Sequence, residues 1–110
     1  MVIVTNKPEQ FVAPLLSGLG LEGVFEFVIG GDTLPEKKPH PLPLLHSCER
    51  LGLSVEACVM VGDSKNDILS ANRAGMESIG VRYGYNYGEP IEQYHPRVVC
   101  DRFDELLAYL

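Results

Sequence analysis

The chain has 110 residues, of which 45% are hydrophobic, so it is the size of one domain, or a piece of one, with a core of its own. Nine Lys and Arg residues against fifteen Asp and Glu residues give a formal net charge of −6, and no basic run occurs, so nucleic acid and anionic membranes are poor candidate partners. An anionic ligand would therefore need a local cluster of donors or a metal ion.

Short β-like runs alternate with helical runs along the whole chain. Strands are predicted at residues 2–5, 25–31, 58–62, 77–84 and 97–100, and the segments between them carry apolar residues mostly at helical spacing, with helices that end at Gly52 and Gly75. A last helix is predicted after Asp101, its N-cap. This alternation predicts an α/β fold, a three-layer Rossmann-like sandwich with a mainly parallel sheet, as one unit over residues 1–110.

The cysteines and the absence of a long apolar segment indicate where the protein works. Cys48, Cys58 and Cys100 are odd in number and lie in apolar surroundings, so we interpret them as buried thiols in a reducing compartment. No segment reaches the roughly 20 apolar residues of a membrane-spanning helix, and the N-terminus lacks the features of a signal peptide. We therefore expect a cytoplasmic location.

The stretch "CVMVGDSKND" sets two carboxylates, Asp63 and Asp67, at the point where a predicted strand gives way to a helix. One or two carboxylates at this edge of a sheet, together with a ligand phosphate, can hold Mg²⁺. Helix capping is the alternative for both residues, and it is stronger for Asp67, because Ser64 and an acid three residues later form a capping box. The residues alone leave both interpretations open.

Two further stretches place polar groups next to helix starts. In "VTNKP", Thr5 and Asn6 follow the first strand and Pro8 suits a first helical turn, which gives either an anion site or an ordinary turn. In "EKKPHPLP", Pro39 holds Lys38 on an extended backbone, which suits a fixed positive charge for a phosphate or a carboxylate cluster. His40 in the same loop is more typical of a surface residue than of a general base.

These stretches, "IVTN", "KKPHP" and "VGDSKND", occur in this order at strand ends and helix starts, and they resemble the second, third and fourth motifs of the haloacid dehalogenase-like phosphatase superfamily. The stretches "KKPHPLPLL" and "VRYGYNYGEPIE" are similar to the phosphoglycolate phosphatases within it. The resemblance covers the whole chain. It implies a Mg²⁺-dependent phosphomonoester hydrolase that acts on a small phosphorylated metabolite and converts 2-phosphoglycolate to glycolate and phosphate.

The resemblance also implies a role for individual residues. Thr5 would hydrogen bond the transferring phosphoryl group, with Asn6 beside it in phosphate binding, and Lys38 would stabilise the charge of that group and of the nucleophile. Asp63 would bind Mg²⁺, and Asp67 would support the site from beside it. The implied catalytic residues are thus Thr5, Lys38 and Asp67.

One part of the family pattern is absent from the sequence. The family carries a first motif, DxDxT, on the central strand, which supplies the nucleophile and the general acid/base, and no such motif occurs here. Asp32 and Asp101 are the other acids near a strand end, and neither has a second aspartate two residues on. The helical cap domain is absent too. The chain therefore resembles the C-terminal portion of such a phosphatase core, and we expect it to be inactive alone, because Lys38, Thr5 and Mg²⁺ can only stabilise charge.

Two alternatives to the phosphatase remain open. A flavodoxin-like or receiver-like module would use Asp63 and Asp67 to hold a cation without hydrolase activity, although the absence of an acid after residues 2–5 weakens this reading. A protein-interaction fragment would bind neither metal nor phosphate. Reading the coding sequence upstream of Met1 for a strand with the first motif would decide most of this question.

The missing central strand leaves two arrangements of the sheet open. The strands ending at Thr5 and at Val61 could pair directly, giving the order 2-1-3-4-5 and moving Thr5 and Lys38 towards Asp63 by one strand spacing, ~4.8 Å. Alternatively, a strand from another chain could fill the gap, because an unpaired buried edge costs several hydrogen bonds. We expect the chain alone to be marginal or oligomeric, with self-association or the missing N-terminal segment supplying the partner.

Overall fold

The computed structural model describes residues 1–21, 23–82 and 89–109, and its strands form two separate parallel sheets. The first pairs β1 (Ile3–Val4) with β2 (Val28–Ile29), and the second has the order β3-β4-β5. These three strands are β3 (Val59–Gly62), β4 (Glu77–Val81) and β5 (Val98–Cys100). Every predicted strand is thus found, in a shorter form, and the α/β class with parallel pairing is confirmed.

Helices fill the connections, as the sequence predicts. The α-helices are α1 (Val12–Gly18), α2 (Leu42–Leu51) and α3 (Lys65–Ala74), and α2 and α3 end at Gly52 and Gly75, whose φ angles of 69° and 75° lie in the left-handed region that favours glycine. The remaining turns are 3₁₀ helices: η1 (Glu9–Phe11), η2 (Val55–Ala57), η3 (Ile91–Tyr94) and η4 (Phe103–Ala108). No helix among the described residues is long and apolar enough to cross a bilayer.

The C-terminal segment differs from the prediction in helix type. A helix was expected after Asp101, and the structure forms the 3₁₀ helix η4, where Glu105 N–H donates to the Arg102 carbonyl at 3.2 Å, three residues back. The Glu105 carboxylate accepts the Asp101 N–H at 3.3 Å, so the acid in the first turn reaches back to the segment's start. The tyrosine-rich loop at 83–88 and residue 110 lie outside the described residues.

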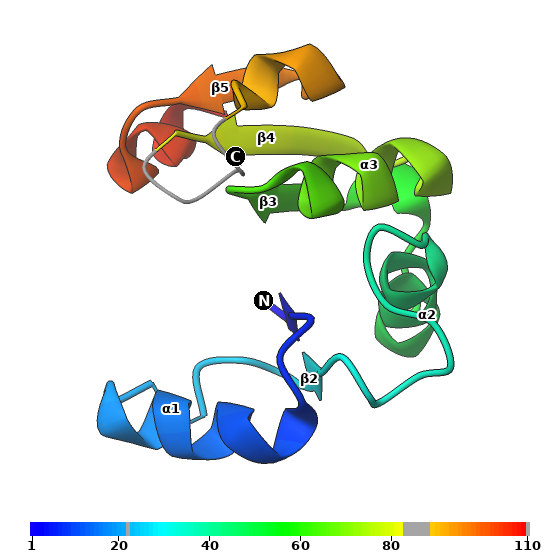
Figure 1. Cartoon of the computed structure of the whole chain (residues 1–110), viewed down its shortest axis with the longest axis vertical. Helices are drawn as coiled ribbons and strands as arrows, with labels where there is room; N and C mark the ends of the chain where they lie inside the picture. The colour runs from blue at the N-terminus through cyan, green and yellow to red at the C-terminus, as the bar shows by residue number, and fades with distance from the viewer. Residues whose placement is uncertain (22, 83–88, 110) are drawn as a thin grey trace.

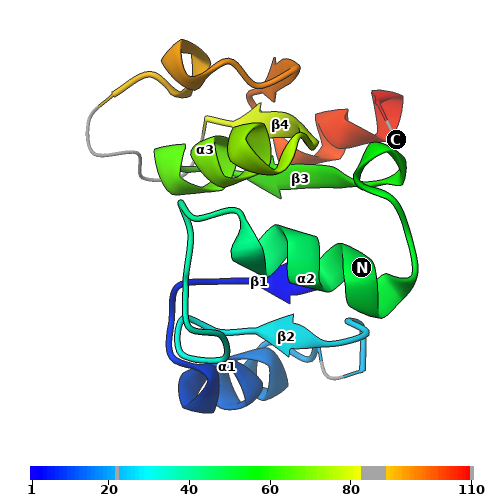
Figure 2. The ribbon, with the colours of Figure 1, turned by 90° about the vertical axis from the view of Figure 1, so that its right-hand side faces the viewer.

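The two sheets are held together by the helical layer. Figures 1 and 2 show α2 and α3 on one side of the strands, with α2 at the level between β1 and β3. The core cluster in that layer contains Leu44 and Cys48 of α2 with Ala71 of α3, and Val4 of β1 and Met60 of β3 both pack against it. A second cluster, Ile79, Val81 and Cys100, holds β4 to β5. The first cluster therefore fixes the two sheets at a distance from each other.

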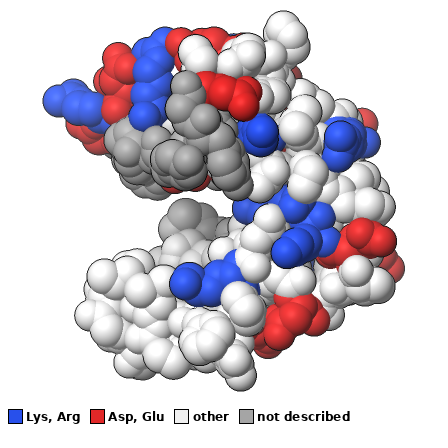
Figure 3. All heavy atoms as spheres, in the orientation of Figure 1, with Lys and Arg blue, Asp and Glu red and all other residues white. Residues whose placement is uncertain are grey.

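The closed sheet order 2-1-3-4-5 is wrong for this structure. Within the described residues β1 pairs with β2 and β3 pairs with β4, and β1 does not pair with β3. Val4 of β1 and Met60 of β3 instead both pack against the cluster that contains Leu44 and Cys48 of α2, so apolar burial holds the two strands on the same helix. Figure 3 shows the surface hollowed between the two halves of the molecule, and cavities of about 460 and 220 Å³ lie there.

Candidate active site

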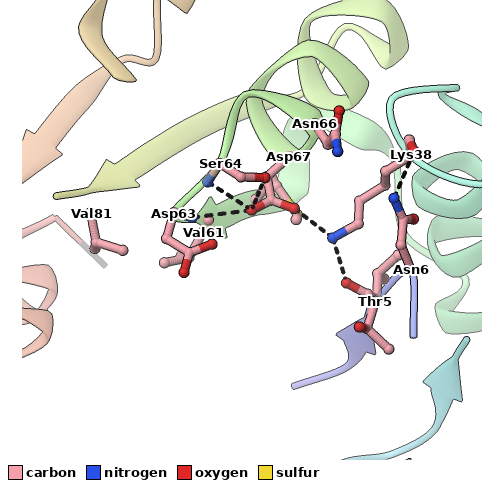
Figure 4. A pocket seen from close by; sticks show the side chains of 12 residues that line it. Thr5, Asn6, Lys38, Val61, Asp63, Ser64, Asn66, Asp67 and Val81 are labelled. Atoms are coloured by element: carbon pink, nitrogen blue, oxygen red, sulfur yellow. Dashed lines mark hydrogen bonds and ion pairs between the residues drawn. The ribbon is translucent and has the colours of Figure 1, made fainter. Parts of the chain in front are cut away.

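The site residues predicted from the sequence meet in one cavity. The cavity of about 460 Å³ lies at the carboxyl ends of β1 and β3. Its lining includes Thr5 and Asn6 after β1, Lys38 from the loop before α2, and Asp63 and Asp67 from the turn and helix after β3. Figure 4 shows these side chains converging from elements that are far apart in the sequence. This is the place where open parallel sheets bind ligands.

Lys38 occupies the centre of this arrangement. Its side chain is only 8% exposed, and Nζ donates to Asp67 Oδ1 at 2.5 Å and to the Val4 carbonyl at 2.7 Å. The Asn6 amide donates to the Lys38 carbonyl at 2.9 Å, which fixes the backbone of the same residue, and the Lys38–Pro39 peptide bond is cis. A lysine held at both ends is a fixed positive charge, as predicted from the proline-rich stretch.

Asp67 is a cap and an ion-pair partner at once. Its Oδ2 accepts the backbone N–H groups of Asp63 at 3.1 Å and Ser64 at 3.2 Å, so the capping box predicted at the start of α3 is confirmed. Its Oδ1 faces Lys38. Gly62 makes this approach possible, because a Cβ at Gly62 would lie 2.3 Å from Asp67 Oδ2. Both oxygens of the Asp67 carboxylate therefore already accept hydrogen bonds from the protein.

Asp63 differs from Asp67 in having an uncommitted carboxylate. No hydrogen bond or ion pair of its side chain is formed with the described part of the chain, and Figure 4 shows it across Asp67 from Lys38, at the wall of the cavity. The described residues contain no group of three His, Cys, Asp or Glu side chains placed to hold a metal. A cation here would thus rest on one protein carboxylate, with further oxygen ligands from water or substrate.

The residues after β1 behave differently from each other. Thr5 Oγ1 accepts the Lys7 N–H at 3.2 Å, which leaves its own proton available to a ligand oxygen. Asn6 spends its amide N–H on the Lys38 carbonyl, and its Oδ1 is buried without a partner among the described residues. Asn6 thus positions Lys38 directly. This bond uses one of the two N–H groups of the Asn6 amide, so the second N–H is the side-chain donor that could reach a phosphate oxygen.

The other acids near strand ends are used elsewhere. Asp32 Oδ1 accepts the Glu9 N–H at 2.8 Å at the start of η1. The sequence allowed an anion site at this helix start, and a carboxylate of the chain itself binds there. Asp101 pairs with Arg82 at 2.6 Å. His40 Nδ1 accepts the Leu42 N–H at 3.0 Å, a turn contact. These residues are not part of the cavity lining.

Sequence reasoning missed two contributors. The Val4 carbonyl accepts Lys38 Nζ, and a main-chain group of this kind leaves no signal in residue types. Gly62 gives Asp67 its close approach, and its signal was a glycine placed directly between a strand and an acid. Asn66 and Ser64 also line the cavity, both inside the quoted "SKND" stretch.

Comparison with known proteins agrees with this geometry. A family model described as haloacid dehalogenase-like hydrolase matches residues 1–81, a span that contains all five predicted site residues. The chain belongs to this family. As a member of the haloacid dehalogenase-like hydrolases it is hydrolase-like by resemblance, and the resemblance stated from the three sequence motifs is confirmed.

Individual relatives within the family are phosphoglycolate phosphatases. The chain is 54% identical over 110 residues to a phosphoglycolate phosphatase of Colwellia psychrerythraea, covering all of the chain and 49% of that protein. It is 50% identical over 108 residues to the phosphoglycolate phosphatase of Escherichia coli, covering 98% of the chain and 43% of the relative. The chain thus spans about half the length of the relatives it matches.

Solved structures share the fold. A crystal structure of a predicted phosphoglycolate phosphatase from Haemophilus somnus has a TM-score of 0.95 at 42% identity, over 98% of this chain and 48% of that one. CbbY from Rhodobacter sphaeroides, solved in complex with phosphate, has a TM-score of 0.84 at 26% identity, over 96% of this chain and 47% of that one. The fold prediction is therefore confirmed on structures as well as on sequence.

Proposed function

We propose that the chain forms the phosphate- and Mg²⁺-binding part of a phosphomonoesterase whose substrate is a small phosphorylated metabolite, 2-phosphoglycolate in the whole enzyme. The observation that carries the proposal is the convergence of Thr5, Lys38, Asp63 and Asp67 on one cavity. The names of the phosphoglycolate phosphatases that the chain resembles support the substrate, and the phosphate bound to CbbY supports the ligand class.

Each side chain then has a definite task. The Lys38 ammonium has two of its three N–H groups committed to protein oxygens, so one remains to donate to a phosphoryl oxygen. The Thr5 hydroxyl donates to a second phosphoryl oxygen. Asp67 keeps Lys38 in place through the ion pair between its Oδ1 and the Lys38 Nζ. Together they bind and orient the dianion at a fixed point.

The residues present fit a magnesium ion. Mg²⁺ prefers oxygen ligands and is commonly held by one or two carboxylates plus phosphate and water, and Asp63 offers an uncommitted carboxylate on a cavity with room for hydrated ligands. When bound, the ion would neutralise charge developing on the phosphoryl oxygens. Asp63 would hold it while Lys38 and Thr5 hold the phosphate.

Turnover by the chain alone is not expected. Among the described residues, the acids that line the cavity are Asp63, assigned to the cation, and Asp67, whose oxygens are already bound to Lys38 and to backbone amides. Neither is left to attack phosphorus in line. The proposed activity therefore belongs to the whole enzyme, and this chain supplies charge stabilisation and positioning.

Backbone amide NMR shifts during titration with Mg²⁺ and inorganic phosphate test the proposal. Mg²⁺ at millimolar concentration should shift amides 62–67, and phosphate should add shifts at residues 5–6 and 38. Asp63→Asn should remove the Mg²⁺ response, whereas the matched control Asp104→Asn, at an exposed residue of η4, should leave it intact. A metal response without a phosphate response would favour the cation-binding module instead. No response to either would overturn the proposal.

An activity assay independently tests the proposal that this chain binds phosphate and Mg²⁺ but does not turn substrate over alone. Purified chain with 2-phosphoglycolate and excess Mg²⁺ should release no phosphate above background. Release that disappears in Asp63→Asn would show that the chain is active alone and would contradict the account above. Release that persists in Asp63→Asn would come from a contaminating phosphatase, since that variant lacks the proposed cation ligand.

A further inference from the structure

The backbone around Lys38 forms a turn that is attached to the rest of the molecule through its carbonyl groups. The His40 N–H donates to the Lys37 carbonyl at 2.9 Å and closes the turn. Each of the next three carbonyls, those of residues 38, 39 and 40, accepts a hydrogen bond from a side chain outside the turn. Asn6, which follows β1, supplies the bond to the first of them at 2.9 Å.

Helix α3 supplies the donors for the other two carbonyls. The Ser70 hydroxyl donates to the His40 carbonyl at 2.8 Å, and Arg73 Nη1 donates to the carbonyl before it at 3.2 Å. Asp67 of the same helix accepts the Lys38 ammonium at 2.5 Å. Positions 67, 70 and 73 are three residues apart, so their side chains follow one another along one side of the helix. That side of α3 therefore binds both the ammonium and the backbone that carries it.

Two buried serines in the helical layer use their hydroxyls differently. Ser47 of α2 donates to the Pro43 carbonyl at 2.7 Å, four residues back in its own helix, a bond that serines within helices often make. Ser70 of α3 donates out of its helix, to His40. The two residues are 7% and 0% exposed. The hydroxyls are thus alike in burial and bond length, and only the bond of Ser70 reaches the Lys38 turn.

The position of a lysine ammonium depends on the backbone beneath it. The side chain of Lys38 is a flexible stem, and Figure 4 shows it extended across the cavity, where Nζ donates to Asp67 and to the Val4 carbonyl. If the backbone were free to move, several rotamers could make these two bonds, and the remaining N–H of the ammonium would point in a different direction in each. A turn bonded to α3 restricts this choice.

We propose that Ser70, with Arg73 as a weaker second attachment, is a positioning residue for Lys38. By bonding the turn to α3, it fixes the direction in which the ammonium presents its remaining N–H to a phosphoryl oxygen. The phosphate part of this inference rests on the proposed function, whereas the attachment of the turn is testable without any ligand. Arg73 contributes less because it is exposed and its bond is longer.

The first experiment examines the turn in the 110-residue chain without metal or phosphate. Ser70→Ala removes the donor to His40, and the matched control Ser47→Ala removes a hydroxyl bond that stays within α2. Hydrogen exchange at the His40 amide should become about fivefold faster in Ser70→Ala, and the ¹⁵N signal of the Lys38 ammonium should shift or broaden. Ser47→Ala should change the exchange rate by less than about twofold and leave the ammonium signal in place.

The second experiment measures ligand affinity in the same variants. In the presence of Mg²⁺, the dissociation constant for inorganic phosphate, followed by the amide shifts of residues 5–6 and 38, should rise about fivefold in Ser70→Ala and about twofold in Arg73→Met. The dissociation constant for Mg²⁺ alone should change by less than about twofold, because neither substitution touches Asp63. Ser47→Ala should leave both constants within the same limit. A general loss of stability would instead weaken both ligands.

Folding of the variants is checked by far-UV CD. Alanine is the most favourable residue in a helix interior, so both serine variants should keep their helices. Arg73→Met changes an exposed residue and keeps the proposal falsifiable if Ser70→Ala folds poorly, because its smaller effects on the His40 amide and on phosphate should have the same direction. The double variant Ser70→Ala/Arg73→Met should weaken phosphate binding more than either single change.

Several results would overturn the proposal. An unchanged His40 exchange rate and ammonium signal in Ser70→Ala would show that the turn does not depend on this serine. Equal effects of Ser70→Ala and Ser47→Ala would show that both serines only stabilise the helical layer. A loosened turn with unchanged phosphate affinity would show that the turn does not position Lys38 for phosphate. A parent chain that binds no phosphate would overturn the proposed function together with the phosphate part of the inference, whereas the ligand-free comparison decides the attachment by itself.

Discussion

Because Lys38 and Asp67 form a buried ion pair, we expect Asp67→Asn to lower the free energy of unfolding by an unusually large amount. The side chains are 8% and 9% exposed and their charged atoms lie 2.5 Å apart, and removing one partner of a buried pair typically costs about 3–5 kcal/mol. The variant amide must keep its oxygen on the Ser64 N–H and so turns its NH₂ group towards the Lys38 ammonium. Donor then faces donor. We expect the free energy of unfolding to fall by about 3–4 kcal/mol.

The partner variant should cost less. Lys38→Met leaves the Asp67 carboxylate with the N–H groups of Asp63 and Ser64, so its charge stays partly compensated, and we expect a loss of about 2 kcal/mol. In the double variant Lys38→Met/Asp67→Asn the two losses should not add, with a coupling of about 1.5–2 kcal/mol. The order of the two single losses follows from the hydrogen bonds that each leaves behind.

Urea unfolding followed by far-UV CD measures these losses as shifts in midpoint at constant slope. Lys65→Met on the same helix is the matched control: Lys65 pairs with Glu89 at 3.5 Å, but the side chains are 33% and 38% exposed, so its loss should stay within about 0.5 kcal/mol. Equal, small losses for Asp67→Asn and Lys65→Met, or additive losses in the double variant, would refute the buried pair as a source of stability.

Two further predictions concern Gly62 and Cys48. Gly62→Ala places a methyl 2.3 Å from Asp67 Oδ2 and should lower the free energy of unfolding by about 2 kcal/mol and weaken Mg²⁺ binding, whereas Gly18→Ala, with no atom within 4 Å, should do neither. Burial, with Cys58 as a neighbour, raises the pKa of Cys48 from 9.0 to about 11, so the unfolded state loses the proton first and stability should fall between pH 9 and 11. Urea midpoints at pH 8 and 10.5 should show a smaller fall in Cys48→Ala.

The positions of the site residues could be predicted because each lies at a strand end or helix start that the sequence marks. Gly52 and Gly75 stop helices, and the "SKND" capping box starts one, so the elements around the site were largely fixed locally. Parallel strands then deliver their carboxyl ends to one edge, which brought Thr5 and Asp63 to the same cavity. Local rules sufficed for this part of the structure.

The width of the sheet could not be predicted, because no local signal sets it. It depends on Val4 and Met60 packing on the same helical cluster, contacts between residues far apart in the chain. The burial of Lys38 and its bond to a main-chain carbonyl depend on the same arrangement. The C-terminal helix type was missed for a related reason, since the apolar periodicity of residues 103–110 does not separate a 3₁₀ helix from an α-helix.

The site and the spacing of the sheets are therefore one structure. The Lys38 ammonium donates to the Val4 carbonyl at the end of β1 and to Asp67 at the start of α3. It therefore links the two sheets at one end of the space between them. The core cluster that contains Leu44 and Cys48 of α2 also contacts both strands, through Val4 of β1 and Met60 of β3. The side chain that we propose for phosphate binding thus also helps to set how far β1 stands from β3. Substitutions that release Lys38 from Asp67 should consequently weaken phosphate binding and lower the free energy of unfolding, whereas Asp63→Asn, which leaves both Lys38 bonds in place, should weaken only metal binding.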